Sequence, residues 1–327
     1  MNIWKEENRI AHITLALALL IGSFSLLSIA FGLNKNKTIF YTNSQDQIIN
    51  EVNITKNNPR VSSLFSFNES LEETIESKYI LQKLEKLGNI QARSFLVGDL
   101  DTGEVIFERK PYTVYPIASV TKFMTAYTAA DNLSPNELAK ITKDKLKVEG
   151  NRGRFRVGDY LTIRELLYPL LLVSSNDAGE IIARQRGRDD FIEKMILSSE
   201  KLGMYSTNLE DPTGLSKNNT STARDLFSMM RAVRRDYPQI IDISRISFKE
   251  NDQYLWTNIN KSARFSEFRG GKTGYTNAAR QTSIGYYQIQ LANDQTKNIA
   301  VVILQSDTRQ KDTRNILDYL KTYVAYL

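Results

Sequence analysis

The sequence predicts a mixed fold, α/β in the broad sense and α+β in detail, in which strands from both ends of a globular region enclose a helical middle. Residues 94–110 contain two strand-like runs around a turn at 101–104, which is the pattern of a β-hairpin. Residues 283–294 and 297–307 also have strand-like composition. Between these regions, apolar residues recur mostly at helical spacing.

Five segments are expected to be helical. The expected helix over 70–88 has acidic residues near its start, an apolar face and Gly88 at its end. Its first turns belong either to this helix or to the preceding segment. The expected helix over 161–184 is interrupted near residues 174–176, where polar residues follow an apolar run. The last carries a stripe that includes Ile316 and Leu320, which indicates core packing. The expected helices are 70–88, 115–133, 161–184, 222–235 and 308–327.

Residues 13–33 form an uncharged apolar run, ITLALALLIGSFSLLSIAFGL. As a helix rising about 1.5 Å per residue, this run reaches roughly 30 Å, the thickness of the hydrocarbon core of a bilayer. We therefore predict a transmembrane signal-anchor, with residues 1–12 in the cytoplasm. A cleavable signal peptide, with a loose cleavage site at 28–30, and a buried soluble helix are the alternatives. Charges on the two sides of the run are nearly balanced, so its orientation is taken from the rest of the chain.

Two further regions follow the apolar run. Residues 34–68 are rich in Asn, Ser, Thr and Lys without a sustained period, which is typical of a stalk or linker. Residues 69–327 contain the expected strands and helices and are predicted to form one catalytic domain. The net charge of +6 is spread over many alternating basic and acidic positions, which favours a solvated surface over a nucleic-acid interface. We expect no nucleic-acid partner.

The residue types that are absent restrict the possible chemistry. The sequence has no cysteine and a single histidine, His12, beside the apolar run. Thiol catalysis, disulfides and cysteine-based zinc sites are thereby excluded, and a Ser-His-Asp triad is disfavoured. We expect neither a metal nor a cofactor. A hydrolytic serine would then need another base, and lysine can serve when burial or a neighbouring cation lowers its pKa toward neutrality.

Ser119 and Lys122 offer such a pair. Residues three apart lie on one face of a helix, so the Lys122 amine can reach the Ser119 hydroxyl group. The same spacing recurs at Ser198 and Lys201, which we interpret as an exposed helix face. Ser119 is distinguished by its position at an expected strand-to-helix junction, where backbone amides at a helix start can stabilise an oxyanion.

Two other short segments carry polar groups in unusual places. The run 174–176 (Ser-Ser-Asn) follows the apolar sequence LLYPLLLV, and it is either a helix end or part of a site. The run 272–274 (Lys-Thr-Gly) follows two glycines and precedes the strand pair, and it is either a surface strand start or a binding edge. A strand edge with a cation, a hydroxyl group and a glycine suits a carboxylate-bearing peptide that pairs by β-augmentation.

In this order the three segments resemble the three motifs of penicillin-binding proteins and serine β-lactamases. The wider context, including PIASVTKFMTAY, LGMYSTNLEDPTGLS and GGKTGYTNAA, is similar to low-molecular-weight D-alanyl-D-alanine carboxypeptidases over about residues 91 to 320. The resemblance implies a β-lactamase/D,D-peptidase-like fold, with an antiparallel sheet flanked by helices and a helical subdomain. The three motifs are Ser119-Val120-Thr121-Lys122, Ser174-Ser175-Asn176 and Lys272-Thr273-Gly274.

The resemblance also implies roles for these residues. Ser119 would be acylated by the penultimate D-alanine carbonyl of a peptidoglycan stem peptide, and Lys122 would take its proton. Ser174 and Asn176 would position the amide and assist protonation of the leaving group. The residues implied for substrate binding are Lys272, Thr273, Gly274 and Arg309. The backbone N–H groups of Ser119 and Tyr275 would form the oxyanion hole. By the same resemblance, β-lactams would be covalent inhibitors and the catalytic domain would lie outside a bacterial cell membrane.

The sequence departs from the family pattern at two places. The family's Asn-Pro-His-Gly reads Asp211-Pro212-Thr213-Gly214, and Arg280 replaces a common glycine, which leaves the substrate preference open. The expected activity is that of a serine-type D-alanyl-D-alanine carboxypeptidase. The alternatives are a D,D-endopeptidase of the same fold, a β-lactamase, for which no convincing Glu-x-x-x-Asn element is present, and an inactive wall-binding protein.

Overall fold

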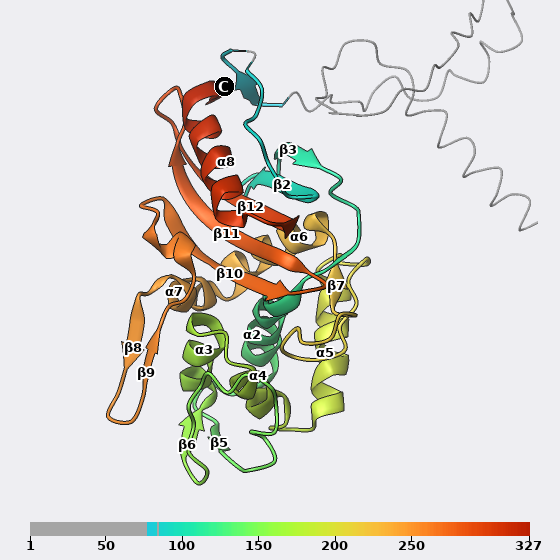
Figure 1. Cartoon of the computed structure of the whole chain (residues 1–327), viewed down its shortest axis with the longest axis vertical. Helices are drawn as coiled ribbons and strands as arrows, with labels where there is room; N and C mark the ends of the chain where they lie inside the picture. The colour runs from blue at the N-terminus through green and yellow to red at the C-terminus, as the bar shows by residue number, and fades with distance from the viewer. Residues whose placement is uncertain (1–76, 84) are drawn as a thin grey trace, which may run out of the picture. The chain divides into compact units, whose positions relative to one another are not determined.

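The computed structural model of this protein describes residues 77–83 and 85–327. Its main sheet has five antiparallel strands, and β12 pairs with β2, so segments from both ends of the described chain meet in one sheet (Figure 1). In spatial order the strands are β10 (Phe268–Thr276), β11 (Arg280–Gln290), β12 (Thr296–Ser306), β2 (Ser94–Asp99) and β3 (Val105–Arg109).

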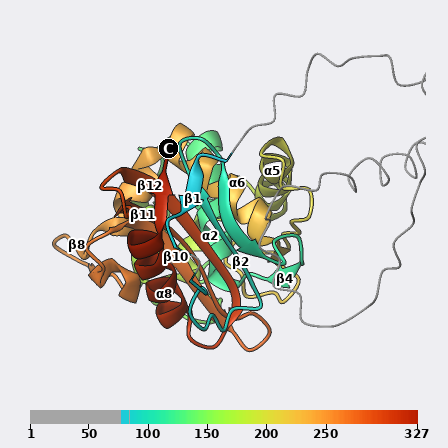
Figure 2. The same cartoon turned by 90° about the horizontal axis from the view of Figure 1, so that it is seen from above.

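The two faces of the sheet belong to two separate hydrophobic clusters. Leu96 and Val302 pack into the larger cluster, whereas Val97 and Val301 pack into the smaller one. This alternation arises because successive side chains of a strand point to opposite faces. The smaller cluster includes the apolar face of α8 (Arg309–Tyr323), and the larger one joins the sheet to the helical part of the chain. Figure 2 shows α8 lying along the strands of the main sheet.

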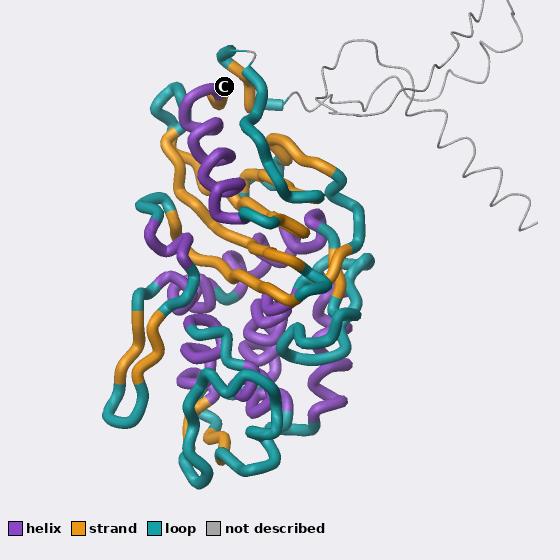
Figure 3. Tube along the Cα trace, viewed as in Figure 1, coloured by secondary structure: helices purple, strands orange, loops and turns teal. Residues whose placement is uncertain are grey.

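The helical part lies on one side of the sheet, as the tube in Figure 3 shows. At its centre is α2 (Thr121–Asn132), which is buried from Thr121 to Ala129 and packs against helices on several sides. Because α2 is surrounded, its polar side chains are cut off from water: Lys122 and Thr125 form hydrogen bonds inside the protein, whereas Thr128 Oγ1 forms none with the other described residues. The surrounding helices are α3 (Ile163–Leu172), α4 (Asn176–Ala183), α5 (Arg188–Lys201), α6 (Ala223–Asp236) and α7 (Pro238–Arg245).

Short elements connect the two parts. The 3₁₀ helix η1 (Ala118–Val120) leads directly into α2, and η2 (Lys261–Arg264) precedes β10. Six short strands form antiparallel pairs: β4 (Tyr115–Pro116) with β7 (Thr220–Ser221), β5 (Leu138–Lys140) with β6 (Tyr160–Thr162), and β8 (Phe248–Glu250) with β9 (Leu255–Thr257).

Most of the expected elements are confirmed. The hairpin near the N-terminus is β2 and β3, and the two strands near the C-terminus are β11 and β12. The interruption expected in the 161–184 segment separates α3 from α4. Thr162 begins α3 with a capping box, since its side chain accepts from the Glu165 backbone and the Glu165 side chain accepts from the Thr162 backbone.

The expectation of a helix over 70–88 is wrong for its described residues. These contain the strand β1 (Tyr79–Leu81), which pairs antiparallel with β13 (Val324–Tyr326) at the C-terminus. The last expected helix accordingly ends at Tyr323. β1 pairs with a strand more than two hundred residues away, and this pairing satisfies backbone N–H and C=O groups that a helix would otherwise satisfy. A local sequence pattern does not reveal such a distant partner.

The predicted signal-anchor at 13–33 and stalk at 34–68 lie outside the described residues. Within the part of the chain that the structure describes, no helix has the length and apolar character needed to cross a bilayer.

A side-chain hydrogen bond that attaches β1 to β2 makes a testable contribution to stability. The Tyr79 hydroxyl group donates to the buried Asp99 carboxylate at 2.6 Å. Tyr79→Phe leaves one oxygen of that carboxylate without this donor, so we expect the free energy of unfolding to fall by about 1–3 kcal/mol. Urea denaturation measures this loss. The exposed Tyr112 is the control, and an equal effect of Tyr112→Phe would contradict the assignment.

Candidate active site

The segment 118–122, which carries Ser119 and Lys122 and is called the reactive segment below, lies where the sheet meets the helical part. Ser119 is on η1, and Lys122 is in the first turn of α2. Ala118, directly before Ser119, has a positive φ of 47°, a backbone conformation that is costly for a residue with a side chain. Such local strain is maintained only where surrounding contacts enforce it.

The amine of Lys122 contacts three oxygen atoms. Its Nζ lies 3.1 Å from Ser119 Oγ, 2.7 Å from Asn176 Oδ1 and 2.6 Å from the Thr213 carbonyl oxygen. The Thr213 carbonyl can only accept, and Asn176 presents its oxygen because its Nδ2 donates to the Glu149 carbonyl. A neutral amine has two hydrogens for these two acceptors, so its lone pair is left for the Ser119 hydroxyl group.

The environment of Lys122 favours the neutral amine. Its side chain is fully buried, and this desolvation is the main cause that lowers the pKa of Lys122 to about 7. The negative charges of Asp211 and Asp177 oppose the decrease, and the positive charge of Arg152 adds to it. A lysine with a pKa near 7 can act as a base at neutral pH.

The Ser-Ser-Asn run forms the junction between α3 and α4. Ser174 has a positive φ of 58°, Ser175 caps α4 by accepting from Ala178 N, and Asn176 is the first residue of α4. The junction therefore brings Asn176 to Lys122. The Ser174 side chain is nearly buried, and no other described residue forms a hydrogen bond with it.

The Lys-Thr-Gly run lies within β10 rather than at a surface strand start. Lys272 is almost fully buried, and burial first, then the charges of Lys122, Arg309 and Arg152, hold its pKa well below the ordinary value. A Cβ on Gly274 would lie 2.9 Å from both the Ser119 nitrogen and the Ile117 carbonyl oxygen. Glycine is therefore required for β10 to pass this close to the reactive segment.

Arg309 reaches the same strand from the first turn of α8. Its Nη1 donates to the Gly274 carbonyl at 2.7 Å, and burial lowers its pKa. In the described part of the chain, neither Arg309 nor Lys272 forms an ion pair with an acidic side chain. Thr273 beside Lys272 is partly exposed, and the side chain of Tyr275 is exposed. The described residues contain no cluster of acidic or histidine side chains that could hold a metal.

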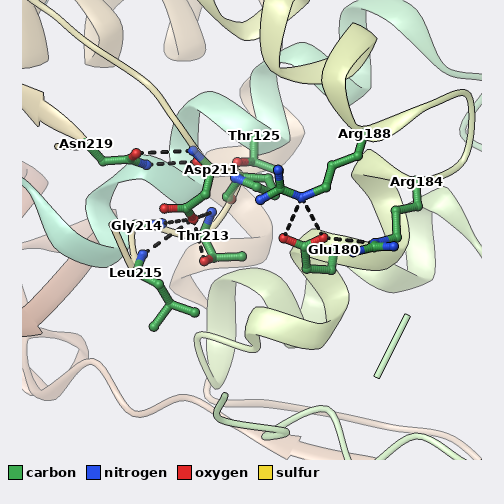
Figure 4. Close-up of polar contacts among 10 residues, drawn as sticks. Thr125, Glu180, Arg184, Arg188, Asp211, Thr213, Gly214, Leu215 and Asn219 are labelled. Carbon is green, nitrogen blue, oxygen red and sulfur yellow. Dashed lines mark hydrogen bonds and ion pairs between the residues drawn. The ribbon is translucent and has the colours of Figure 1, made fainter. Parts of the chain in front are cut away.

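Sequence reasoning missed how one turn contributes to the site. Residues 211–214 were noted as a departure from the family pattern, but not as a partner of Lys122. The Thr213 carbonyl accepts from the Lys122 amine. Asp211 in turn accepts from the Thr213 hydroxyl group, as Figure 4 shows. A backbone carbonyl has no residue-type signal, so only the unusual Asp-Pro-Thr-Gly run could have pointed to this turn.

Two other expectations have clear outcomes. The second Ser-x-x-Lys match lies on α5, where Lys201 is exposed but Ser198 is buried, so the expected exposed face is only partly correct. Arg280 begins β11 with a positive φ of 51° and forms an ion pair with Asp307 at 2.5 Å. This conformation, which glycine adopts readily, explains why glycine would fit there.

The close approach of Gly214 to η1 gives a stability prediction. A Cβ at Gly214 would lie 1.9 Å from the Ala118 carbonyl oxygen, and Gly214 has a φ of +82°. We expect Gly214→Ala to lower the free energy of unfolding by about 4 kcal/mol or more, since both backbone strain and a backbone clash act. Chemical denaturation is the measurement.

Gly203 is a matched control, because its φ is +73° but nothing lies within 4 Å of its Cβ position. Gly203→Ala should cost only about 1–2 kcal/mol, the penalty of the left-handed conformation. Equal losses for the two variants would contradict the close approach at Ala118.

Comparisons with known proteins show which family this chain is similar to. A family model described as D-alanyl-D-alanine carboxypeptidase, peptidase S11, matches residues 81–308. A D-alanyl-D-alanine carboxypeptidase of Mycobacterium tuberculosis is 35% identical over 202 residues, which cover 59% of this chain and 69% of that protein. A D-alanyl-D-alanine endopeptidase of Escherichia coli is 30% identical over 232 residues, which cover 66% of this chain and 72% of that protein.

Solved structures show the same fold. A crystal structure of a D-alanyl-D-alanine carboxypeptidase from Mycobacterium tuberculosis has a TM-score of 0.67 and 29% identity, covering 72% of this chain and 92% of that chain. Penicillin-binding protein D2 from Listeria monocytogenes, in its cefotaxime-bound form, has a TM-score of 0.62 and 25% identity, covering 73% and 99%.

Proposed function

Because this chain belongs to the D-alanyl-D-alanine carboxypeptidase family of S11 serine peptidases, we propose that it removes the terminal D-alanine from peptidoglycan stem peptides ending in D-Ala-D-Ala. The observation that carries this proposal is the placement of the Lys122 amine between Ser119, Asn176 and the Thr213 carbonyl. This arrangement supplies a serine with a buried base in a chain that has no cysteine and whose one histidine lies outside the described residues.

In the proposed acylation step, Ser119 Oγ attacks the carbonyl carbon of the penultimate D-alanine. Lys122 accepts the hydroxyl proton as the bond forms, and the resulting ammonium group is stabilised by Asn176 and the Thr213 carbonyl. The amide C–N bond to the terminal D-alanine then breaks, and the departing amine takes the proton held by Lys122, with Ser174 and Asn176 assisting, so that Lys122 is neutral again. Water then hydrolyses the ester on Ser119 and restores the free hydroxyl group.

The proposed oxyanion hole consists of the backbone N–H groups of Ser119 and Tyr275. Support comes from the 2.9 Å between the Ser119 nitrogen and the Cβ position of Gly274, because β10 then passes next to the amide of the nucleophile. Two amides held by rigid elements can stabilise the developing negative charge, and each is worth about 3 kcal/mol in comparable sites.

The proposed site for the terminal carboxylate is formed by Lys272, Thr273 and Arg309. Lys272 is almost fully buried and Arg309 is half-buried, and burial lowers the pKa of both, so a positive charge held there without a counter-ion is costly. An anionic substrate would supply the missing negative charge, and Thr273 adds a hydroxyl donor. The strand β10 provides the edge along which the peptide backbone would lie.

A D,D-endopeptidase that cuts crosslinked stem peptides is the second candidate function. The endopeptidase of Escherichia coli is among the most similar relatives, with 30% identity, so this reaction on the same acyl-enzyme route has a specific basis. For either reaction we propose that the catalytic domain is extracytoplasmic, held at a bacterial cell membrane by the segment 13–33, since the wall peptides are outside the cell.

The proposal is tested with muropeptides of defined structure. We expect the full chain in detergent to release free D-alanine from pentapeptide monomers, as measured by mass spectrometry, and Ser119→Ala to release none. Release of crosslinked partners instead would identify an endopeptidase. Fast turnover of a chromogenic cephalosporin without peptide cleavage would identify a β-lactamase, and no reaction with either substrate would contradict the enzyme assignment.

A fluorescent penicillin is expected to label the nucleophile covalently. Labelling should be lost in Ser119→Ala and should fall by about 10²-fold or more in Lys122→Ala, because the base is removed. Ser198→Ala is the matched control from the second Ser-x-x-Lys pair and should label like the wild type. Equal labelling of Ser119→Ala would overturn the nucleophile assignment.

The pH dependence of acylation should report the base. Because burial lowers the pKa of Lys122 to about 7, the amine is protonated below that pH and cannot accept the Ser119 proton. We therefore expect the second-order rate constant for penicillin acylation to rise with pH and to level off above about pH 7. A rate that is independent of pH through this range would contradict Lys122 as the base.

A further inference from the structure

The carboxylate of Asp211 organises the turn that faces Lys122. Its Oδ1 accepts from Thr213 N at 2.7 Å, Thr213 Oγ1 at 2.6 Å and Gly214 N at 2.8 Å (Figure 4). Its Oδ2 accepts from Ser216 N at 2.7 Å. Asp211 is almost completely buried. Leu215 N also donates to Oδ1, at 3.4 Å. One carboxylate therefore accepts from four backbone N–H groups and closes the turn, so the position of the Thr213 carbonyl depends on it.

This turn is joined to α2 at successive points. The Thr125 hydroxyl group donates to the Pro212 carbonyl at 2.5 Å, and the Lys122 amine donates to the Thr213 carbonyl at 2.6 Å. Residues 122 and 125 are three apart and lie on one face of the helix. The turn thus holds the face of α2 that carries the proposed base.

Asn219 fixes the other side of the turn. Its Nδ2 donates to the Asp211 carbonyl at 2.8 Å and to Thr121 Oγ1 at 3.2 Å, while its Oδ1 accepts from Asp211 N. Because Thr121 precedes Lys122 on α2, the same two elements are linked a third time. Asp211 is therefore held in place by groups other than its own carboxylate.

Charged groups surround the Lys122 amine from several elements. Asp211 from the turn and Asp177 from α4 favour its ammonium form, whereas Arg152 from the β5–β6 loop disfavours it. Lys272 on β10 is a second buried amine, and the charge of Lys122 is one of the causes that lower its pKa, after burial. Among these groups, Asp211 is the strongest charge that favours the ammonium form.

Asp211 itself is expected to be ionised. Burial disfavours its charge, but the hydrogen bonds from Thr213 and the backbone outweigh this and hold the pKa of the carboxyl below its ordinary value. Arg188 on α5 also attracts the carboxylate, while forming ion pairs with Glu180, which Arg184 shares (Figure 4). A negative charge is therefore present next to the base throughout the neutral range.

We propose that Asp211 is a positioning residue for acylation: its carboxylate fixes the Thr213 carbonyl that holds the Lys122 amine, and its charge favours the protonated amine formed when Ser119 gives up its proton. This inference rests on the proposed role of Lys122 as the base. Asp211 acts through Lys122 and the turn and does not touch the substrate.

The test separates charge from geometry with two variants. Asp211→Asn keeps the size of the side chain but removes the charge, so the acid limb of the acylation profile should move to lower pH by about one unit, because the amine loses its proton more easily. Asp211→Glu keeps the charge but displaces the carboxylate. The acid limb should therefore remain at the same pH, while the maximal acylation rate falls by roughly 10-fold or more.

Asp225 provides a matched control. It is also buried and accepts hydrogen bonds from Ser206 N and Thr207 Oγ1, but it does not act on Lys122. Asp225→Asn should therefore lower stability without moving the acid limb. Thermal melting of each variant shows how much stability is lost, and the Glu variant carries the test if the Asn variant does not fold.

The outcomes distinguish this inference from the proposed function. An unshifted acid limb in Asp211→Asn, an equal shift in Asp225→Asn, or a wild-type rate in Asp211→Glu would each overturn the role of Asp211. Undiminished acylation of Lys122→Ala would instead reject Lys122 as the base, whatever the Asp211 variants do.

Discussion

The ε-amine of Lys122 is buried without a charged hydrogen-bond partner, and much of the surrounding structure serves to make this possible. A fully buried amine loses the hydration that stabilises its charge, so its proton is held weakly. Three oxygen atoms from three different elements replace water around it. The arrangement depends on α2 lying at the centre of the helical part, where solvent does not reach its first turn.

The junction of the sheet and the helices brings the residues proposed to bind substrate close to this amine. Gly274 allows β10 to pass beside the Ser119 amide, and Gly214 allows the 211–216 turn to lie against the Ala118 carbonyl. Both contacts leave no space for a Cβ atom. The strained backbone of Ala118 between them is therefore enforced from two sides, which presents Ser119 at the junction rather than inside either layer.

Several cations converge on the site from separate parts of the chain. Lys122, Lys272, Arg309 and Arg152 come from α2, β10, α8 and the β5–β6 loop, and their charges disfavour one another. Among the described residues, neither Lys272 nor Arg309 forms an ion pair with an acidic side chain, so this part of the site attracts anions. A peptide that ends in a carboxylate fits this electrostatic requirement. Asp211 offsets part of the repulsion at the base without occupying the region where substrate would lie.

The sequence alone was enough to predict the α+β class, the hairpin and the paired strands, because alternating and helical apolar patterns are local properties of the chain. It also predicted that Ser119 and Lys122 lie close together, since residues three apart in a helical segment lie on the same face, and η1 continues directly into α2. The tertiary structure decided the features that local sequence patterns do not encode. Pairing of β1 with β13 overrode a helical pattern in the described part of 70–88, and the Thr213 carbonyl became a partner of Lys122 through folding of a distant turn. Both depend on contacts between residues far apart in the sequence, for which residue type gives no signal.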